Sequence, residues 1–186
     1  MEMEMEMKLK GSKTEKNLFR TFAGESRART KYDLYAEKAR AEGYQWVGQV
    51  FNETALNEYA HARRSYGQLL NRVGSTKENL LDAIMGETSE FKDIYKRFEE
   101  EAREEGFMEI ADFYKELREV EESHQVRYQA LYDRLQDGKM FKGEQESKWI
   151  CMNCGYIHEG MDAPLVCPLC KYPRAYFKPL CETTNL

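Results

Sequence analysis

Proline and cysteine are confined to the C-terminal end of this 186-residue chain. All four prolines and all five cysteines follow residue 150. Because proline disrupts helix interiors, its absence from the first 150 residues permits long helices there. The remaining segment is too short to build a sizeable apolar core unaided. The sequence therefore predicts a helical domain followed by a small unit that its cysteines stabilise.

Capping and turn signals divide the first 138 residues into four helices. Ser12 and Glu15 form a capping-box pattern, and Gly43 is placed to end the first helix. The loop at 71–75 separates the second helix from the third, which Thr76 can cap. The expected helices are 13–43, 44 to about 70, 76 to about 106, and 107 to about 136. They make two helical hairpins, which favours a four-helix bundle.

The two hairpins resemble one another at an offset of 63 residues. The segment ARAEGY at 39–44 corresponds to AREEGF at 102–107. The same offset relates Tyr32 to Tyr95 and His61 to His124. A repeated hairpin predicts approximate two-fold symmetry, which suits a site for two metals. Coincidental similarity between amphipathic helices is the alternative.

Four glutamates interrupt the apolar faces of these helices. Apolar side chains recur at steps of three and four residues, as a bundle core requires. The interruptions are Glu25, Glu58, Glu87 and Glu121, one on each helix. Burying unpaired carboxylates costs several kcal/mol each, so cations must neutralise them. Arg29 lies on the same face of the first helix, and the sequence does not explain it.

The four glutamates also lie at matching depths. Glu25 precedes the Gly43 turn by 18 residues, and Glu58 follows it by 15. At a rise of about 1.5 Å per residue, this mismatch is only about 5 Å. Glu87 precedes the second turn, at Gly106, by 19 residues, and Glu121 follows it by 15. The sequence therefore predicts that all four carboxylates converge in the middle of the bundle.

Two of the glutamates are followed by a histidine three residues later. Glu58 and His61, like Glu121 and His124, share one helical face and can bind or flank a metal pair. A histidine with ordinary core hydrogen bonds is the alternative for either one alone. Repetition and the partner glutamates favour metal binding. Glu90, one turn further along the third helix, is either a fifth carboxylate of the site or a solvated glutamate.

Four cysteines form two CxxC pairs separated by twelve residues: Cys151, Cys154, Cys167 and Cys170. This spacing predicts one tetrahedral metal site rather than disulfides, and hence a reducing compartment. Four thiolates accept both zinc and iron, so the spacing does not choose between them. Cys181 lies outside the pattern and is interpreted as a spare thiol.

Charge and hydropathy restrict the partners and the location. A net charge of −5 and a pI near 5.4 predict no attraction to nucleic acids. No stretch resembles a signal peptide or a membrane span, so we expect a soluble cytoplasmic protein. The expected division is a disordered or expression-derived N-terminus at 1–12, the bundle at 13–138, a linker at 139–148 and the cysteine domain at 149–186.

These motifs together resemble the rubrerythrin family over about residues 7–180. The match runs through 23–26 (AGES), 58–61 (EYAH), 86–90 (GETSE), 121–124 (EESH) and the CxxCGYxHEG segment at 151–160. The resemblance implies a ferritin-like di-iron four-helix bundle followed by a rubredoxin-like domain, which tilts the choice of metal at the cysteines towards iron. Lys171 departs from the pattern, because free-standing rubredoxins usually have glycine there.

Carried over to this sequence, the resemblance implies a set of site residues. The iron ligands would be Glu25, Glu58, Glu87, Glu90, Glu121 and His124, with His61 entering when the site is reduced. In the family one iron moves between a glutamate and a histidine, which gives Glu90 and His61 their roles. Tyr32 and Tyr95 look like the family tyrosines that hydrogen-bond the ligand carboxylates.

The implied activity is that of a peroxidase protecting against oxidative stress. The di-iron site would reduce hydrogen peroxide to water with electrons passed through the four-cysteine iron. Because the chain has no Gly-rich dinucleotide fingerprint, electrons would come from an NAD(P)H-dependent reductase or a rubredoxin. The family also implies a homodimer or larger assembly. The alternatives are a ferroxidase or iron-storage protein, an oxygen-reducing di-iron protein, and a zinc ribbon on an inert bundle.

Overall fold

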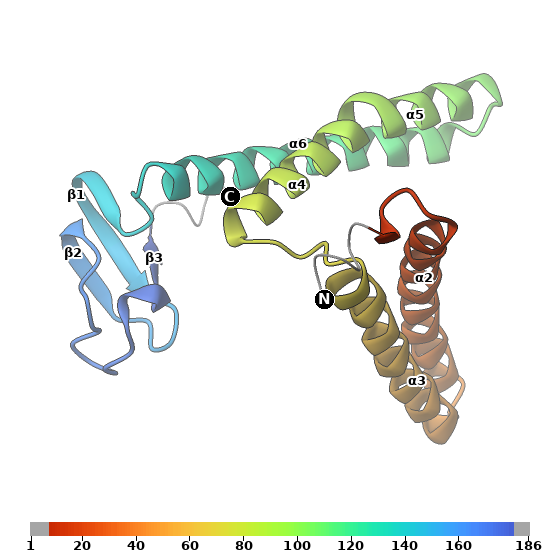
Figure 1. Cartoon of the computed structure of the whole chain (residues 1–186), viewed down its shortest axis with the longest axis horizontal. Helices are drawn as coiled ribbons and strands as arrows, with labels where there is room; N and C mark the ends of the chain where they lie inside the picture. Colours follow the sequence, from red (N-terminus) through yellow and green to blue (C-terminus); the bar gives the residue numbers. More distant parts are fainter. Residues whose placement is uncertain (1–7, 181–186) are drawn as a thin grey trace. The chain divides into compact units, whose positions relative to one another are not determined.

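The computed structural model describes residues 8–180, and its helices follow the two predicted hairpins (Figure 1). The first hairpin consists of α2 (Lys13–Ala41) and α3 (Gln45–Arg63), which continues as a π-helix, η1 (Arg64–Leu69). The second consists of α4 (Thr76–Ser89), the π-helix η2 (Glu90–Ile94), α5 (Tyr95–Glu104) and α6 (Met108–Gln136). The helical fold class with a small four-cysteine region is thereby confirmed.

Small side chains let α2 and α3 approach closely in the first hairpin. The residues buried between them are Ala36, Ala39, Gly48, Ala55 and Ala62. The hairpin begins where the Ser12 hydroxyl accepts a 3.0 Å hydrogen bond from the Glu15 backbone N–H. It turns at Gly43, whose φ of +88° suits glycine. The predicted cap at Ser12 and the predicted turn at Gly43 therefore determine where α2 begins and ends.

The second hairpin is held by a complete capping box, in which Ser75 and not the predicted Thr76 is the N-cap of α4, and by an arginine between its helices. The Ser75 hydroxyl accepts from the Glu78 backbone N–H, and the Glu78 carboxylate accepts from the Ser75 backbone N–H at 2.8 Å. Across the hairpin, Arg118 donates to the Glu99 carboxylate at 2.7 Å and to the Phe91 carbonyl at 3.0 Å. These bonds tie α6 to η2 and to α5.

The third helix is not the continuous α-helix that the sequence predicts, because η2 interrupts it. The physical reason lies in the internal repeat. Tyr32 follows Glu25 by seven residues, whereas Tyr95 follows Glu87 by eight. The extra residue is absorbed by the wider π turn, which is a common way for a helix to accommodate an insertion.

The C-terminal region is a three-stranded antiparallel sheet in the order β2-β1-β3. Its strands are β1 (Lys142–Cys151), β2 (Ile157–Asp162) and β3 (Phe177–Pro179). Trp149, Cys151, Ala163, Cys167 and Phe177 form its buried core. β1 extends into the segment predicted as a linker, because its polar residues pair through the backbone with β2 across a register shift.

Some sequence-based expectations fall outside the described residues. The N-terminal segment predicted at 1–12 lies there as far as residue 7, as does the interpretation of Cys181 as a spare thiol. Residues 8–12 are described: the Gly11 backbone N–H donates to the Glu15 carboxylate at 2.6 Å, and Ser12 is the N-cap of α2. Within residues 8–180, no helix has both the length and the apolar character needed to cross a membrane.

Two glycines give a matched test of packing in the first hairpin. A Cβ at Gly48 would lie 2.9 Å from Cγ of Arg40 and 3.1 Å from the Ala36 carbonyl oxygen, whereas a Cβ at Gly24 meets nothing within 4 Å. Alanine is favoured over glycine in helices by up to about 1 kcal/mol. We expect Gly24→Ala to raise the free energy of unfolding of the metal-free protein and Gly48→Ala to lower it. Urea denaturation followed by circular dichroism measures both, and equal stabilisation by the two variants would contradict this close packing.

Candidate metal centres

The first hairpin gathers two carboxylates and one imidazole at its surface. Glu25 comes from α2, and Glu58 and His61 come from α3. The Nδ1 atom of His61 lies 3.0 Å from Oε2 of Glu58 and 3.6 Å from Oε2 of Glu25. All three residues can offer one ligand atom within 4.8 Å of the others. This hairpin therefore presents the donors for one metal ion.

The second hairpin repeats this arrangement. Glu87 comes from α4, and Glu121 and His124 come from α6. The Nδ1 atom of His124 lies 2.8 Å from Oε2 of Glu121 and 3.8 Å from Oε2 of Glu87. The internal repeat predicted from the sequence thus extends to the geometry of the donors. We name these two groups, Glu25–Glu58–His61 and Glu87–Glu121–His124, the first and second clusters.

Crowding of the carboxylates shifts their protonation. In the first cluster, a shared hydrogen bond with Glu58 and partial burial raise the pKa of Glu25, while the same hydrogen bond and the one to His61 lower the pKa of Glu58. In the second, burial and the Glu121 carboxyl raise the pKa of Glu87. Each cluster therefore favours an added positive charge, either a proton or a metal ion.

The other predicted site residues lie outside the clusters, and two of them, Glu90 and Tyr95, are close to the second cluster. Glu90, the first residue of η2, is close enough that its charge adds to the rise in pKa of Glu87. Burial, followed by the charge of Glu90, also raises the pKa of Tyr95. Among the described residues, neither the Tyr32 nor the Tyr95 hydroxyl makes a hydrogen bond to a carboxylate. Their rings pack instead, Tyr32 against Phe51 and Tyr95 against Tyr114.

Arg29, which the sequence leaves unexplained, stacks on an aromatic ring. Its guanidinium carbon lies 4.3 Å from the centroid of the Tyr59 ring, on the neighbouring helix. The sequence offers no clear signal for this contact, because the two residues belong to different helices and are 30 positions apart. The stack explains how a charged residue is accommodated on this face of the helix.

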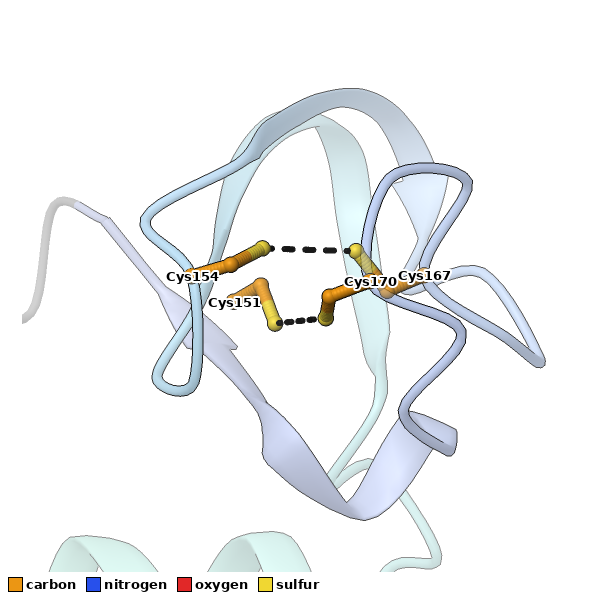
Figure 2. Close-up of side chains that lie close together, drawn as sticks. All are labelled: Cys151, Cys154, Cys167 and Cys170. Carbon is orange, nitrogen blue, oxygen red and sulfur yellow. Dashed lines mark hydrogen bonds between the residues drawn. The ribbon is translucent and has the colours of Figure 1, made fainter.

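The four cysteines converge from two similar turns, as Figure 2 shows. The Sγ atoms of Cys151 and Cys170 lie 3.7 Å apart, as do those of Cys154 and Cys167. A tetrahedron with metal–sulfur bonds of about 2.3 Å places its sulfurs roughly 3.8 Å apart. The sulfurs therefore already have the spacing that one tetrahedral metal requires. Cys151 and Cys167 are buried, while Cys154 and Cys170 are accessible to solvent.

The two cysteine turns share one backbone shape although their sequences differ. Gly155 has a φ of +77° and Lys171 a φ of +63°, and each donates its backbone N–H to the first cysteine of its turn. Lysine adopts this left-handed conformation at a cost that glycine avoids. The Lys171 ammonium also donates to the Pro168 carbonyl at 2.9 Å. Lys171 thus replaces the glycine expected by resemblance without altering the turn.

The closeness of the four thiols shifts the pKa values of two of them in opposite directions. The Tyr156 backbone N–H favours the Cys154 thiolate, but partial burial and the neighbouring sulfurs outweigh it and raise the pKa of Cys154 to about 12. At Cys170, backbone and Asn153 hydrogen bonds, together with the sulfurs, outweigh burial and lower the pKa to about 6. A bound cation would replace the shared protons.

Comparison with known proteins assigns this arrangement to a family. Residues 16–132 match the sequence model of the rubrerythrin family, and residues 149–178 match that of the rubrerythrin rubredoxin-like domain. The chain belongs to the rubrerythrin family. It is 43% identical to rubrerythrin of Porphyromonas gingivalis, over 95% of this chain and 94% of that protein. Rubrerythrin of Nitratidesulfovibrio vulgaris is 39% identical, over 91% and 95%.

Among solved structures, this rubrerythrin is similar to nigerythrin in a mixed-valence state. The identity is 28%, the alignment covers 90% of this chain and 86% of that one, and the TM-score is 0.36.

The metal of this rubrerythrin is iron, in a carboxylate and histidine di-iron site and a four-cysteine site. The donors fit both. Carboxylates are hard ligands that suit ferric and ferrous ions, and imidazole also binds iron. Four thiolates at tetrahedral spacing suit a single rubredoxin-type iron. The open question between zinc and iron at the cysteines is thereby decided by the family rather than by the spacing.

Replacement of Glu87 in the second cluster should change the melting temperature in opposite directions without and with the metal. Because the pKa of Glu87 is raised above 4.5, its ionisation destabilises the metal-free fold as the pH rises through that raised value. Glutamine cannot ionise. In metal-free protein, Glu87→Gln should therefore melt at a higher temperature than the wild type, by a margin that grows as the pH rises from 4.5 to the raised pKa and is constant above it. With iron bound, the variant should melt lower, because a donor is lost.

Thermal unfolding followed by circular dichroism across this pH range measures the margin. The control is Glu122→Gln, an exposed residue of α6 outside the cluster. A margin for Glu87→Gln that does not change with pH would show that the cluster does not strain its carboxylates.

Proposed function

We propose that this rubrerythrin is a peroxidase that reduces hydrogen peroxide to water with electrons passed through its four-cysteine iron. The observation that carries the proposal is the presence, in one chain, of two carboxylate–histidine clusters and one tetrahedral thiolate site. The first type of site can change its coordination during a two-electron reaction. The second keeps one geometry and carries single electrons. Their combination supports a reduction whose electrons come from a separate donor.

For the di-iron site, we propose that the ligands are the residues of both clusters together with Glu90. When bound, the iron pair supplies the two electrons that cleave the O–O bond. The carboxylates would hold the two cations, and each histidine, whose Nδ1 lies within 3.0 Å of a glutamate oxygen of its own cluster, would add an imidazole donor. Glu90 is close enough to act on Glu87 electrostatically, so it can serve as an additional donor, and we assign His61 as its alternative. Tyr95 lies beside the second cluster, and we assign Tyr32 the corresponding role beside the first.

Electrons are proposed to enter through the accessible edge of the cysteine site. Cys154 and Cys170 reach solvent, whereas Cys151 and Cys167 are buried in the core of the sheet. Since the sequence has no dinucleotide-binding fingerprint, the donor is a separate NAD(P)H-dependent reductase or a rubredoxin. Four free thiols suit a reducing compartment, and we infer a cytoplasmic homodimer or larger homo-oligomer.

Stopped-flow absorbance of the thiolate-bound iron tests the proposal. The iron-loaded protein is reduced without oxygen and then mixed separately with hydrogen peroxide or dioxygen. We expect fast oxidation by peroxide and much slower oxidation by dioxygen. Glu58→Ala should slow the peroxide reaction by roughly 100-fold or more, since even partners outside a metal's ligand set typically contribute 10–100-fold. Glu53→Ala, an exposed glutamate of the same helix, should react like the wild type.

Four results would overturn the peroxidase. The visible chromophore could be missing, which would favour zinc at the cysteines. Oxidation could be unaffected by Glu58→Ala. Oxidation could also be equally fast with dioxygen, which would favour an oxygen-reducing protein. Retention of many ferric ions per chain after repeated addition of Fe(II) would favour a ferroxidase or an iron-storage protein.

A further inference from the structure

The first hairpin contains a cavity that the metal clusters do not use. It lies between α2 and α3 and has a volume of about 370 Å³. This size falls within the range of small-molecule sites in proteins. Its lining includes Phe22, Ser26, Arg29, Tyr59, Arg63 and Tyr66. Two arginines and three aromatic rings thus line one small space.

Both arginines of the cavity stack on the same tyrosine. The guanidinium carbons of Arg29 and Arg63 lie 4.3 and 5.8 Å from the centroid of the Tyr59 ring. Within residues 8–180, neither arginine forms an ion pair with a carboxylate. The chain has 33 acidic and 28 basic residues, so acidic partners are abundant elsewhere. Two positive charges that have no counter-ion in the described part of the chain therefore converge on one cavity.

Stacking prepares these arginines for an anion. A guanidinium that packs its face on a ring keeps its N–H edge available, and this planar edge matches a carboxylate or a phosphate. Because the ring already restricts the side chain, less entropy is lost when a ligand binds. Ser26 adds a hydroxyl to the lining. We propose that the cavity binds a small organic anion.

The apolar part of the cavity limits which non-ionic group the ligand can carry. The rings of Phe22 and Tyr66 stack with centroids 4.4 Å apart and planes 27° apart, and both line the cavity. Such a surface favours a flat or short apolar group over a fully hydrated ion. The ligand class is therefore a carboxylate or phosphate monoester with a small aromatic or aliphatic body, and inorganic phosphate alone should bind more weakly.

The internal repeat indicates that hairpin packing does not require this arrangement. At the offset that aligns the two clusters, Tyr59 corresponds to Glu122 and Arg63 to Val126. The second hairpin therefore folds without the shared tyrosine and its arginine. None of the residues of the first cluster lines the cavity, so the two sites are separate.

Calorimetric titration of the iron-loaded full-length protein tests the site. The probes are benzoate, which has an anionic group and a flat body, and inorganic phosphate, which has only the anionic group. We expect saturable binding of one benzoate per chain and weaker binding of phosphate. Arg29→Gln and Arg63→Gln should each weaken benzoate binding by about tenfold or more, as expected for the loss of a charged hydrogen bond. Arg27→Gln, an exposed residue of the same helix, should leave binding unchanged.

A second measurement uses the wild-type protein, so it does not depend on whether the variants fold. Phenylglyoxal modifies accessible arginines, and mass spectrometry locates the products. Benzoate should protect Arg29 and Arg63 but not Arg27. The proposal is overturned if benzoate does not bind saturably, if Arg27→Gln weakens binding as much as the two cavity variants, or if protection does not distinguish the cavity arginines from Arg27.

Discussion

Repulsion between carboxylates is the constraint on which the helical part of this protein depends. Each hairpin places two glutamates beside one histidine. The hydrogen bond shared with Glu58 raises the pKa of Glu25, burial raises that of Glu87, and the charge of the neighbouring carboxylate adds to both shifts. Such clusters are unfavourable in a metal-free protein, and a cation converts the same repulsion into coordination. The i, i+3 spacing on α3 and α6 supplies an acid and an imidazole from a single helix, so each hairpin needs only one further glutamate.

The cysteine region meets a different constraint, because it is too small to be stabilised by apolar burial alone. Its core contains Trp149 and Phe177, but two of its five members, Cys151 and Cys167, are also metal donors. The same side chains therefore contribute to packing and to metal binding. The accessible Cys154 and Cys170 complete the site on its solvent side. The region can remain short because one metal connects both turns to the sheet.

Much of the fold and site could be predicted from the sequence, because the relevant signals are local. The capping residues, the turn glycines and the three- and four-residue periodicity fix the helices, and the ExxH and CxxC spacings fix most donors. Other features depend on tertiary contacts. The stacking of Arg29 on Tyr59 joins two helices, and the early start of β1 depends on pairing with β2. The choice of iron over zinc required comparison with relatives, since thiolate spacing is the same for both.

The π turn at η2 affects how such a protein can evolve. One residue added to an α-helix rotates everything beyond it by about 100°, which would turn a buried face towards solvent. The wider turn confines that disturbance to Glu90–Ile94, and Tyr95 keeps the position that corresponds to Tyr32. Insertion of a single codon can therefore introduce a carboxylate beside a metal cluster in one copy of a duplicated hairpin, while the other copy and the rest of the helix keep their packing.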